Sequence, residues 1–244
     1  MSTQPEQRLA TAFIDLADIL ADDFDVVDFL HRLADHAVAL LGVDECGAML
    51  FSPHGGVVDA TASSERARRV GLAQIELRQG PCWDCSHSGV PITDIPLASG
   101  DAVRRWPRFA EIGLAHEIAG IASLPMTVRG RTIGALGLFR TRPAPLDDAD
   151  LRLGQVLADT AAIAVLNQRG LSEQRMLTEQ LQTALDSRVV IEQAKGMLAG
   201  RAGIGVDEAF ERLRRHARHH QQPLTALAHR VIEDRTELLA GPPA

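Results

Sequence analysis

The pattern of apolar and polar positions predicts helices at the N-terminal end of the chain. Apolar residues recur at helical spacing over Leu9–Leu20 and again over Val26–Leu41. Asp25 precedes the second segment as a plausible N-cap, and Gly42 follows it as a stop signal. The chain therefore begins with two amphipathic helices.

The middle of the chain consists of short apolar runs separated by turn residues. These runs predict about six strands: Cys46–Phe51, Val57–Ala62, Leu72–Leu77, Val90–Ile95, Ile118–Val128 and Thr132–Arg140. The last two form the clearest hairpin, because only the dipeptide Arg-Gly separates the segments IAGIASLPMTV and RTIGALGLFR. Helical insertions are expected at Ser63–Val70, Gly80–Gly89 and Arg104–Glu111. The pattern favours an α+β fold in which helices cover one side of an antiparallel sheet.

A long helix is predicted after the last strand. Asp147 or Asp148 can cap it, and apolar positions continue to about Ala199. Gly170 should weaken this helix by roughly 1 kcal/mol relative to Ala, which leaves open a bend or break within the continuous helix. Beyond it the apolar stripe becomes thin, as in a two-stranded coiled coil, at Leu177, Leu181, Leu185 and Val189.

The segment Ala184–Ile232 reads as three short helices that can share one small core. Glycines interrupt the first helix, and Asp207 is the expected cap of the second. Pro223 suits the first turn of the third helix. We therefore predict a small three-helix bundle at the C-terminal end.

Charge separates this bundle from the rest of the chain. The net charge is −7, which at first argues against nucleic-acid binding. The first 185 residues carry 16 basic and 24 acidic side chains, whereas the last 59 residues carry nine basic and eight acidic ones. Because the N-terminal part would repel a phosphate backbone, only the bundle could accept one. Lys195, the only lysine of the chain, lies in the bundle.

Three motifs in the bundle resemble the ANTAR domain, a family of RNA-binding antiterminator modules in bacterial regulators. They are S-R-x-x-I-E-Q-A-K-G-x-L at Ser187–Leu198, E-A-F-x-x-L-R at Glu208–Arg214 and A-H-R-V-I at Ala228–Ile232. The resemblance implies binding to paired small hairpins in a leader transcript, which prevents a terminator from forming. RNA-binding residues implied by matching positions are Arg188, Gln193, Lys195, Gly196 and Arg214.

Charge and location add Arg201 and Arg215 to this predicted RNA-binding set. Arg188 and Lys195 are two helical turns apart and should project from one face. Gly196 lacks a side chain, so a nucleotide could approach the backbone there. A tract of histidines follows on the second helix, and its charge should depend on pH near neutrality.

The preceding part of the chain resembles a GAF domain, a small-ligand-sensing relative of PAS domains. The supporting residues are Leu41–Phe51, Gln79–Cys82, Asp94, Arg105–Phe109 and Ile133–Phe139. Together the two resemblances imply an α+β GAF-like sensor domain at 1–170, a connecting helix and probable coiled coil at 171–185, and an ANTAR-like RNA-binding domain at 186–240. The resemblance leaves the ligand unassigned.

Cys82, Cys85 and His87 form the one constellation in the predicted sensor that could carry chemistry. Two thiols and an imidazole could serve redox sensing or bind a metal, with Cys46 or His54 as a fourth ligand. The alternative is a short helix below the sensor cavity, in which the cysteines are small apolar residues. We name these three residues as a candidate sensor pocket and expect no bound metal.

No catalytic constellation, signal sequence or apolar run long enough to span a membrane is found, so we expect a cytoplasmic protein without catalytic residues or cofactor. The leading hypothesis is a homodimeric antiterminator that binds RNA and responds to a small-molecule or redox signal, with no membrane partner. One rival is a GAF sensor whose helical tail docks a protein partner. Another is a thiol-dependent GAF-type reductase that uses Cys82 and Cys85.

Overall fold

The structure is a computed structural model that describes residues 4–21, 24–52, 56–142 and 145–233. Its contacts divide the chain into two compact units, Met1–Gly170 and Leu171–Ala244. We describe each unit by itself.

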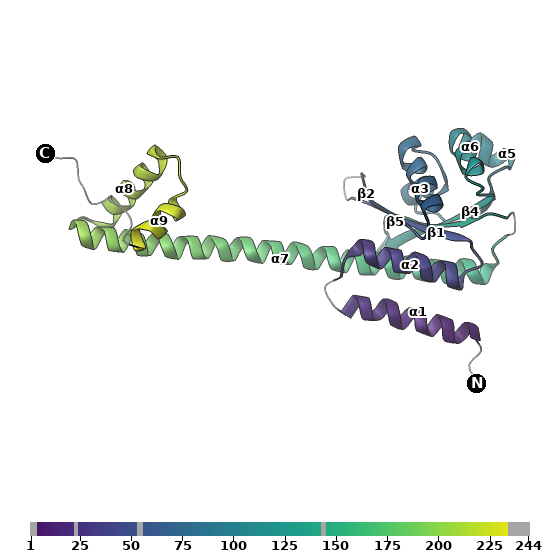
Figure 1. The fold of residues 1–244 in the computed structure, drawn as a ribbon, viewed down its shortest axis with the longest axis horizontal. Coiled ribbons are helices and arrows are strands. Elements are labelled where there is room, and N and C mark those ends of the chain that lie inside the picture. Colours follow the sequence, from purple (N-terminus) through teal and green to yellow (C-terminus); the bar gives the residue numbers. More distant parts are fainter. Residues whose placement is uncertain (1–3, 22–23, 53–55, 143–144, 234–244) are drawn as a thin grey trace. The chain divides into compact units, whose positions relative to one another are not determined.

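The first unit is built on an antiparallel sheet of five strands. They are β1 (Glu45–Phe51), β2 (Val57–Ala62), β3 (Ile92–Pro96), β4 (Gly120–Val128) and β5 (Arg131–Arg140). Their order is β2-β1-β5-β4-β3, so β5 of the predicted hairpin is the central strand and its partner β4 lies beside it (Figure 1). Its link is a tight turn in which Arg129 (φ 50°) and Gly130 (φ 74°) are both left-handed, as two-residue hairpins favour.

The strand predicted at Leu72–Leu77 is wrong, since these residues form the second half of helix α3 (Glu65–Leu77). The Ser64 side chain accepts a hydrogen bond from the backbone N–H of Ala67 and caps this helix. The buried residues Ala67, Val70 and Ala73 then recur at helical spacing. A six-residue alternation is too short to outweigh a capped helix that begins upstream of it.

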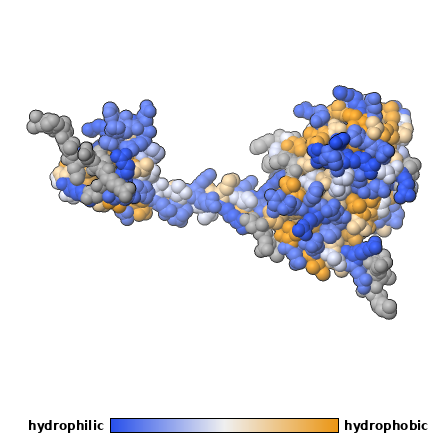
Figure 2. All heavy atoms as spheres, viewed as in Figure 1, coloured by the Kyte–Doolittle hydropathy of each residue, from blue (hydrophilic) through white to orange (hydrophobic). Residues whose placement is uncertain are grey.

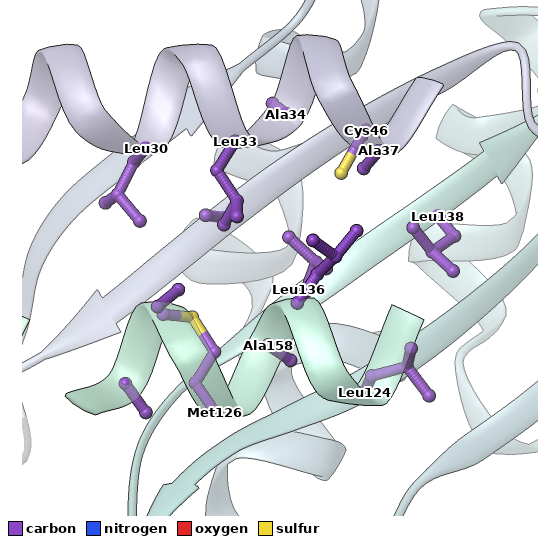
Figure 3. Close-up of a cluster of buried hydrophobic side chains, with 14 of the residues drawn as sticks. Leu30, Leu33, Ala34, Ala37, Cys46, Leu124, Met126, Leu136, Leu138 and Ala158 are labelled. Carbon is purple, nitrogen blue, oxygen red and sulfur yellow. The ribbon is translucent and has the colours of Figure 1, made fainter. Parts of the chain in front are cut away.

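Helices cover both faces of the sheet, not one as predicted. One face packs on α2 (Val26–Leu40) and the start of α7 (Asp148–Ala202), with α1 (Gln4–Ala21) on α2 (Figures 1 and 3). The other face packs on α3, α4 (Pro81–Ser88), α5 (Gly100–Arg105) and α6 (Pro107–Ala115). The physical reason is that consecutive strand residues are apolar: Ala48 and Leu50 bury on the first face and Met49 on the second.

Figure 3 shows the centre of the first face. Leu30 and Leu33 from α2 point toward Leu136 of β5, and Ala158 of α7 closes the same cluster. Asp25 caps α2 as predicted, because its carboxylate accepts from the backbone N–H groups of Val27 and Asp28.

The second unit contains the last part of α7, then α8 (Val206–His219) and α9 (Leu224–Ile232). The predicted three-helix bundle is confirmed. Gly170 does not break the preceding long helix, because α7 is helical through this position. Asp207 is not the cap of α8: Gly205 holds that position, and Asp207 lies in the first turn. The bundle core consists of small and aliphatic residues: Ala194, Leu198, Ala209, Leu213, Ala217, Leu227, Ala228 and Val231.

Candidate RNA interface and sensor core

The face of α7 opposite the bundle core is open. Ala194 and Leu198 are buried in the core, whereas Arg188, Gln193 and Gly196 are exposed. A Cβ placed on Gly196 would meet no described heavy atom within 4 Å. Three of the predicted RNA-binding residues therefore lie on accessible surface, and packing gives no reason for a glycine at position 196.

Lys195 lies where α7 meets α8, and its side chain is only 14% exposed. Its Nζ is 2.9 Å from an Oε of Glu192 and 5.3 Å from the ring centroid of Phe210. This arrangement is a cation–π contact next to an ion pair. The only lysine of the chain thus packs between two helices, with its charge partly offset.

Arg201 also has a contact within the bundle. Its Nη1 donates to the backbone oxygen of Val231, 3.4 Å away, near the end of α9. This hydrogen bond satisfies one of the carbonyls that a helix leaves unpaired at its C-terminus. The structure thus gives Arg201 a stabilising role.

The charges of α8 are divided along its length. Acidic residues occupy its first turn and basic residues its last, which suits the helix dipole at both ends. Arg214, Arg215 and Arg218 are exposed in the C-terminal half. Arg214 lies 3.7 Å from Glu211, but Arg215 and Arg218 make no ion pair with any residue that the structure describes. Figure 2 shows mostly hydrophilic residues over this helix.

Cys82 and Cys85 lie on the buried side of α4, but His87 does not. The Cys85 thiol donates to the backbone oxygen of Ser123, 3.4 Å away. The exposed His87 stacks on Trp83 with ring centroids 4.3 Å apart, and its Nδ1 is 2.8 Å from the Trp83 oxygen. The three residues predicted as one pocket therefore divide into a buried pair and a surface imidazole.

Burial suppresses the reactivity of both thiols. Desolvation raises the pKa of Cys82, and it raises the pKa of Cys85 to about 12. Both groups are therefore protonated at neutral pH, and protonated thiols are weak nucleophiles and weak metal ligands. Within the described residues no group of three or more His, Cys, Asp or Glu side chains could hold a metal ion; His54 lies outside them.

A small cavity lies beside Cys82, between the sheet and α3. Its volume is about 20 Å³, and its walls include Gly47, Met49, Ala60 and Gln74. The Gln74 side chain is buried, and its Oε1 accepts from the backbone N–H of Cys82 at 2.8 Å. A space of this size holds about one water molecule, far less than a nucleotide requires.

These features define a class of protein: an α+β domain followed by a small helical domain whose second helix exposes arginines in its C-terminal half. Residues 25–166 match the family model of the GAF domain, and residues 179–232 match the model of the ANTAR domain. Because the first match covers more than half of the chain, the chain belongs to the GAF family, and its C-terminal part is an ANTAR domain. The two domains together have the general architecture of a regulator, a GAF domain followed by an ANTAR domain, the RNA-binding antiterminator type.

Solved structures support the fold of the first domain. The GAF domain of a phosphoenolpyruvate-protein phosphotransferase from Coxiella burnetii aligns with a TM-score of 0.53 and 13% identity, over 70% of this chain and 99% of that one. The GAF domain of the phosphoenolpyruvate-protein phosphotransferase from Acinetobacter aligns with a TM-score of 0.52 and 12% identity, over 71% of this chain and 99% of that one. No curated protein matches the chain.

No described helix is long and apolar enough to cross a membrane.

Proposed function

We propose that the protein is a signal-responsive transcription antiterminator that binds RNA hairpins in leader transcripts. The observation that carries this proposal is the outer surface of the ANTAR domain: Arg188 and Gly196 on α7, and Arg215 and Arg218 on α8, are exposed. Exposed arginines can neutralise phosphates, and an uncovered glycine admits a nucleotide to the helix backbone.

The proposed RNA-binding residues divide into two groups. Members of the first group would contact RNA directly, because their positions are exposed: Arg188, Gln193, Gly196, Arg214, Arg215 and, added from the structure, Arg218. Lys195 and Arg201 would act by holding the bundle in shape, since Lys195 contacts Phe210 and Arg201 contacts the end of α9.

The active species in this proposal is a homodimer with the domains bounded at 1–170, 171–185 and 186–240. Leu177, Leu181, Leu185 and Val189 recur at four-residue spacing on α7, and each is more than half exposed in the single chain. An apolar stripe of this kind is covered when two such helices pair as a coiled coil. The GAF domain would receive a small-molecule or redox signal and alter the presentation of the two bundles.

The experiment that tests the function is sequencing of RNA crosslinked to the full-length protein in its own cells. Enrichment of leader segments that contain paired hairpins supports the proposal. RNA without such enrichment, together with a protein that co-purifies only when α8 and α9 are intact, would support the docking rival. Turnover of free methionine sulfoxide that depends on Cys82 or Cys85 would support the reductase.

A further inference from the structure

The C-terminal end of α8 carries a cluster of three histidines, in which the rings of His216 and His219 each contact the ring of His220. The rings of His216 and His220 have centroids 4.3 Å apart and planes inclined by 37°. The ring of His219 meets His220 edge-on, at 4.9 Å and 89°. His219 and His220 are exposed, whereas His216 is half-buried beneath them. The exposed ring of His220 is therefore in contact with two other imidazoles.

One cationic side chain lies near this cluster. Arg230 of α9 is close enough for its charge to contribute to lowering the pKa of His216, after burial and His220. The guanidinium of Arg230 is fixed by a 3.0 Å hydrogen bond from its Nη1 to Gln222 Oε1. A nucleic-acid phosphate near the rings could therefore pair with the Arg230 guanidinium.

Flat side chains are otherwise scarce in the ANTAR domain. The sequence from Leu171 onward contains no Trp or Tyr, and its single Phe is Phe210. Phe210 is half-buried, and Lys195 lies over its ring. Proteins read RNA loops by stacking unpaired bases on aromatic rings, histidine included. Among residues 171–233 the exposed imidazoles are those of His219, His220 and His229, and of these His219 and His220 pack against other rings.

We propose that His220, backed by His216 and His219, is a platform on which an unpaired base of the RNA hairpin loop stacks. This inference rests on the proposed RNA-binding function and adds a base contact to the phosphate contacts of the arginines. Burial lowers the pKa of His216, so at neutral pH the ring beneath His220 is uncharged and the stacked pair avoids repulsion between two cations.

The probe for the test is a pool of RNA hairpins with one constant stem and a fully randomised loop. The full-length protein selects binders from the pool, and a selected hairpin is then synthesised with 2-aminopurine at each loop position in turn. If the wild-type protein retains no hairpin, the proposed function itself fails. If it retains hairpins, the stacking proposal is tested by variants of His220.

For His220→Ala we expect affinity to fall about tenfold, a typical cost of removing one base–aromatic stack. Quenching of 2-aminopurine at one loop position should disappear, and the salt dependence of binding should stay unchanged. His220→Phe, which keeps a flat ring, should restore both affinity and quenching. His31→Ala, at an exposed histidine of the sensor domain, is the matched control and should bind as wild type. Wild-type affinity and quenching in His220→Ala would overturn the proposal, as would failure of His220→Phe to restore them.

Discussion

Two glycines, Gly137 in the GAF domain and Gly196 in the ANTAR domain, differ in what their surroundings allow. In the GAF domain a Cβ on Gly137 would lie 2.6 Å from the Cys82 sulfur, so close packing excludes a side chain there. In the ANTAR domain a Cβ on Gly196 would meet nothing described within 4 Å. Packing against the rest of the protein thus explains Gly137, but it does not explain Gly196. The proposed RNA surface gives a reason for Gly196, because a nucleotide could approach the helix backbone there.

The domains also differ in how much core they have. The GAF domain buries two clusters, one on each face of its sheet, whereas the bundle has one small cluster. We expect Leu213→Ala to lower the free energy of unfolding of the bundle by about 2–5 kcal/mol, which is large for so small a core. The bundle should therefore unfold, and RNA binding should be abolished. Leu33→Ala, equally buried in the GAF domain, should destabilise that domain by a similar amount and leave RNA affinity intact. Thermal unfolding and RNA titration of both variants would check this, and abolished RNA binding in Leu33→Ala would break the comparison.

The buried thiols give a second contrast between packing and chemistry. With the pKa of Cys85 raised from 9.0 to about 12, its thiolate fraction at neutral pH falls on the order of a thousandfold. All three cysteines are free and buried, so labelling by a thiol reagent should be slow in the native protein, faster at higher pH and complete after unfolding. Rapid labelling of the native protein at neutral pH would instead favour a redox role.

Gly196→Ala is expected to change the stability of the bundle and its RNA affinity in opposite directions. Alanine in a helix interior is more stable than glycine by roughly 0.5–1 kcal/mol, and space is open at this position. We therefore expect a higher melting temperature for the bundle together with weaker RNA binding, because the new methyl group blocks the helix backbone. Gly200→Ala, a second uncrowded glycine of α7, is the comparison for stability alone. Unchanged RNA affinity in Gly196→Ala would remove Gly196 from the interface.

The smallest effect expected is on pH dependence. Burial, followed by the charges of His220, Arg230 and His219, lowers the pKa of His216 from its ordinary 6.5. The unfolded chain then binds a proton more readily than the folded one, so the stability due to neutral His216 is present above about pH 6.5 and is lost as pH falls below it. Unfolding of the bundle at several pH values, in wild type and His216→Gln, measures the difference. Identical pH profiles would contradict this assignment.

Much of the fold could be predicted from the sequence, because apolar periodicity is local. The hairpin β4–β5, the cap at Asp25 and the three bundle helices follow from short stretches. Coverage of both sheet faces could not be predicted in the same way, because a short continuous apolar strand does not show how many of its faces are buried. The helix at Leu72–Leu77 escapes prediction because a helix and a strand fit so few residues about equally well.

The sites were less predictable, because they depend on contacts between distant residues. Motif position alone suggests that Lys195 faces RNA, but the burial of its side chain depends on Phe210 of another helix. Proximity in sequence groups His87 with Cys82 and Cys85, yet it stacks on Trp83 at the surface. The ring contacts of the histidine cluster likewise depend on the fold, although the spacing of His216 and His220 by one helical turn is a signal for them.

The central claim, that RNA binds the ANTAR domain and not the sensor, is tested most directly by two charge-matched variants of the full chain. Arg215→Ala/Arg218→Ala removes two exposed arginines from α8, and Arg108→Ala/Arg131→Ala removes two from the GAF domain. The affinity of each for a pool-selected RNA hairpin is measured over a range of salt concentrations. For the first variant we predict weaker binding and a salt slope that is smaller by about one for each phosphate no longer neutralised; for the second we predict wild-type behaviour. Equally weakened binding in both variants, or unchanged binding in the first, would contradict the account.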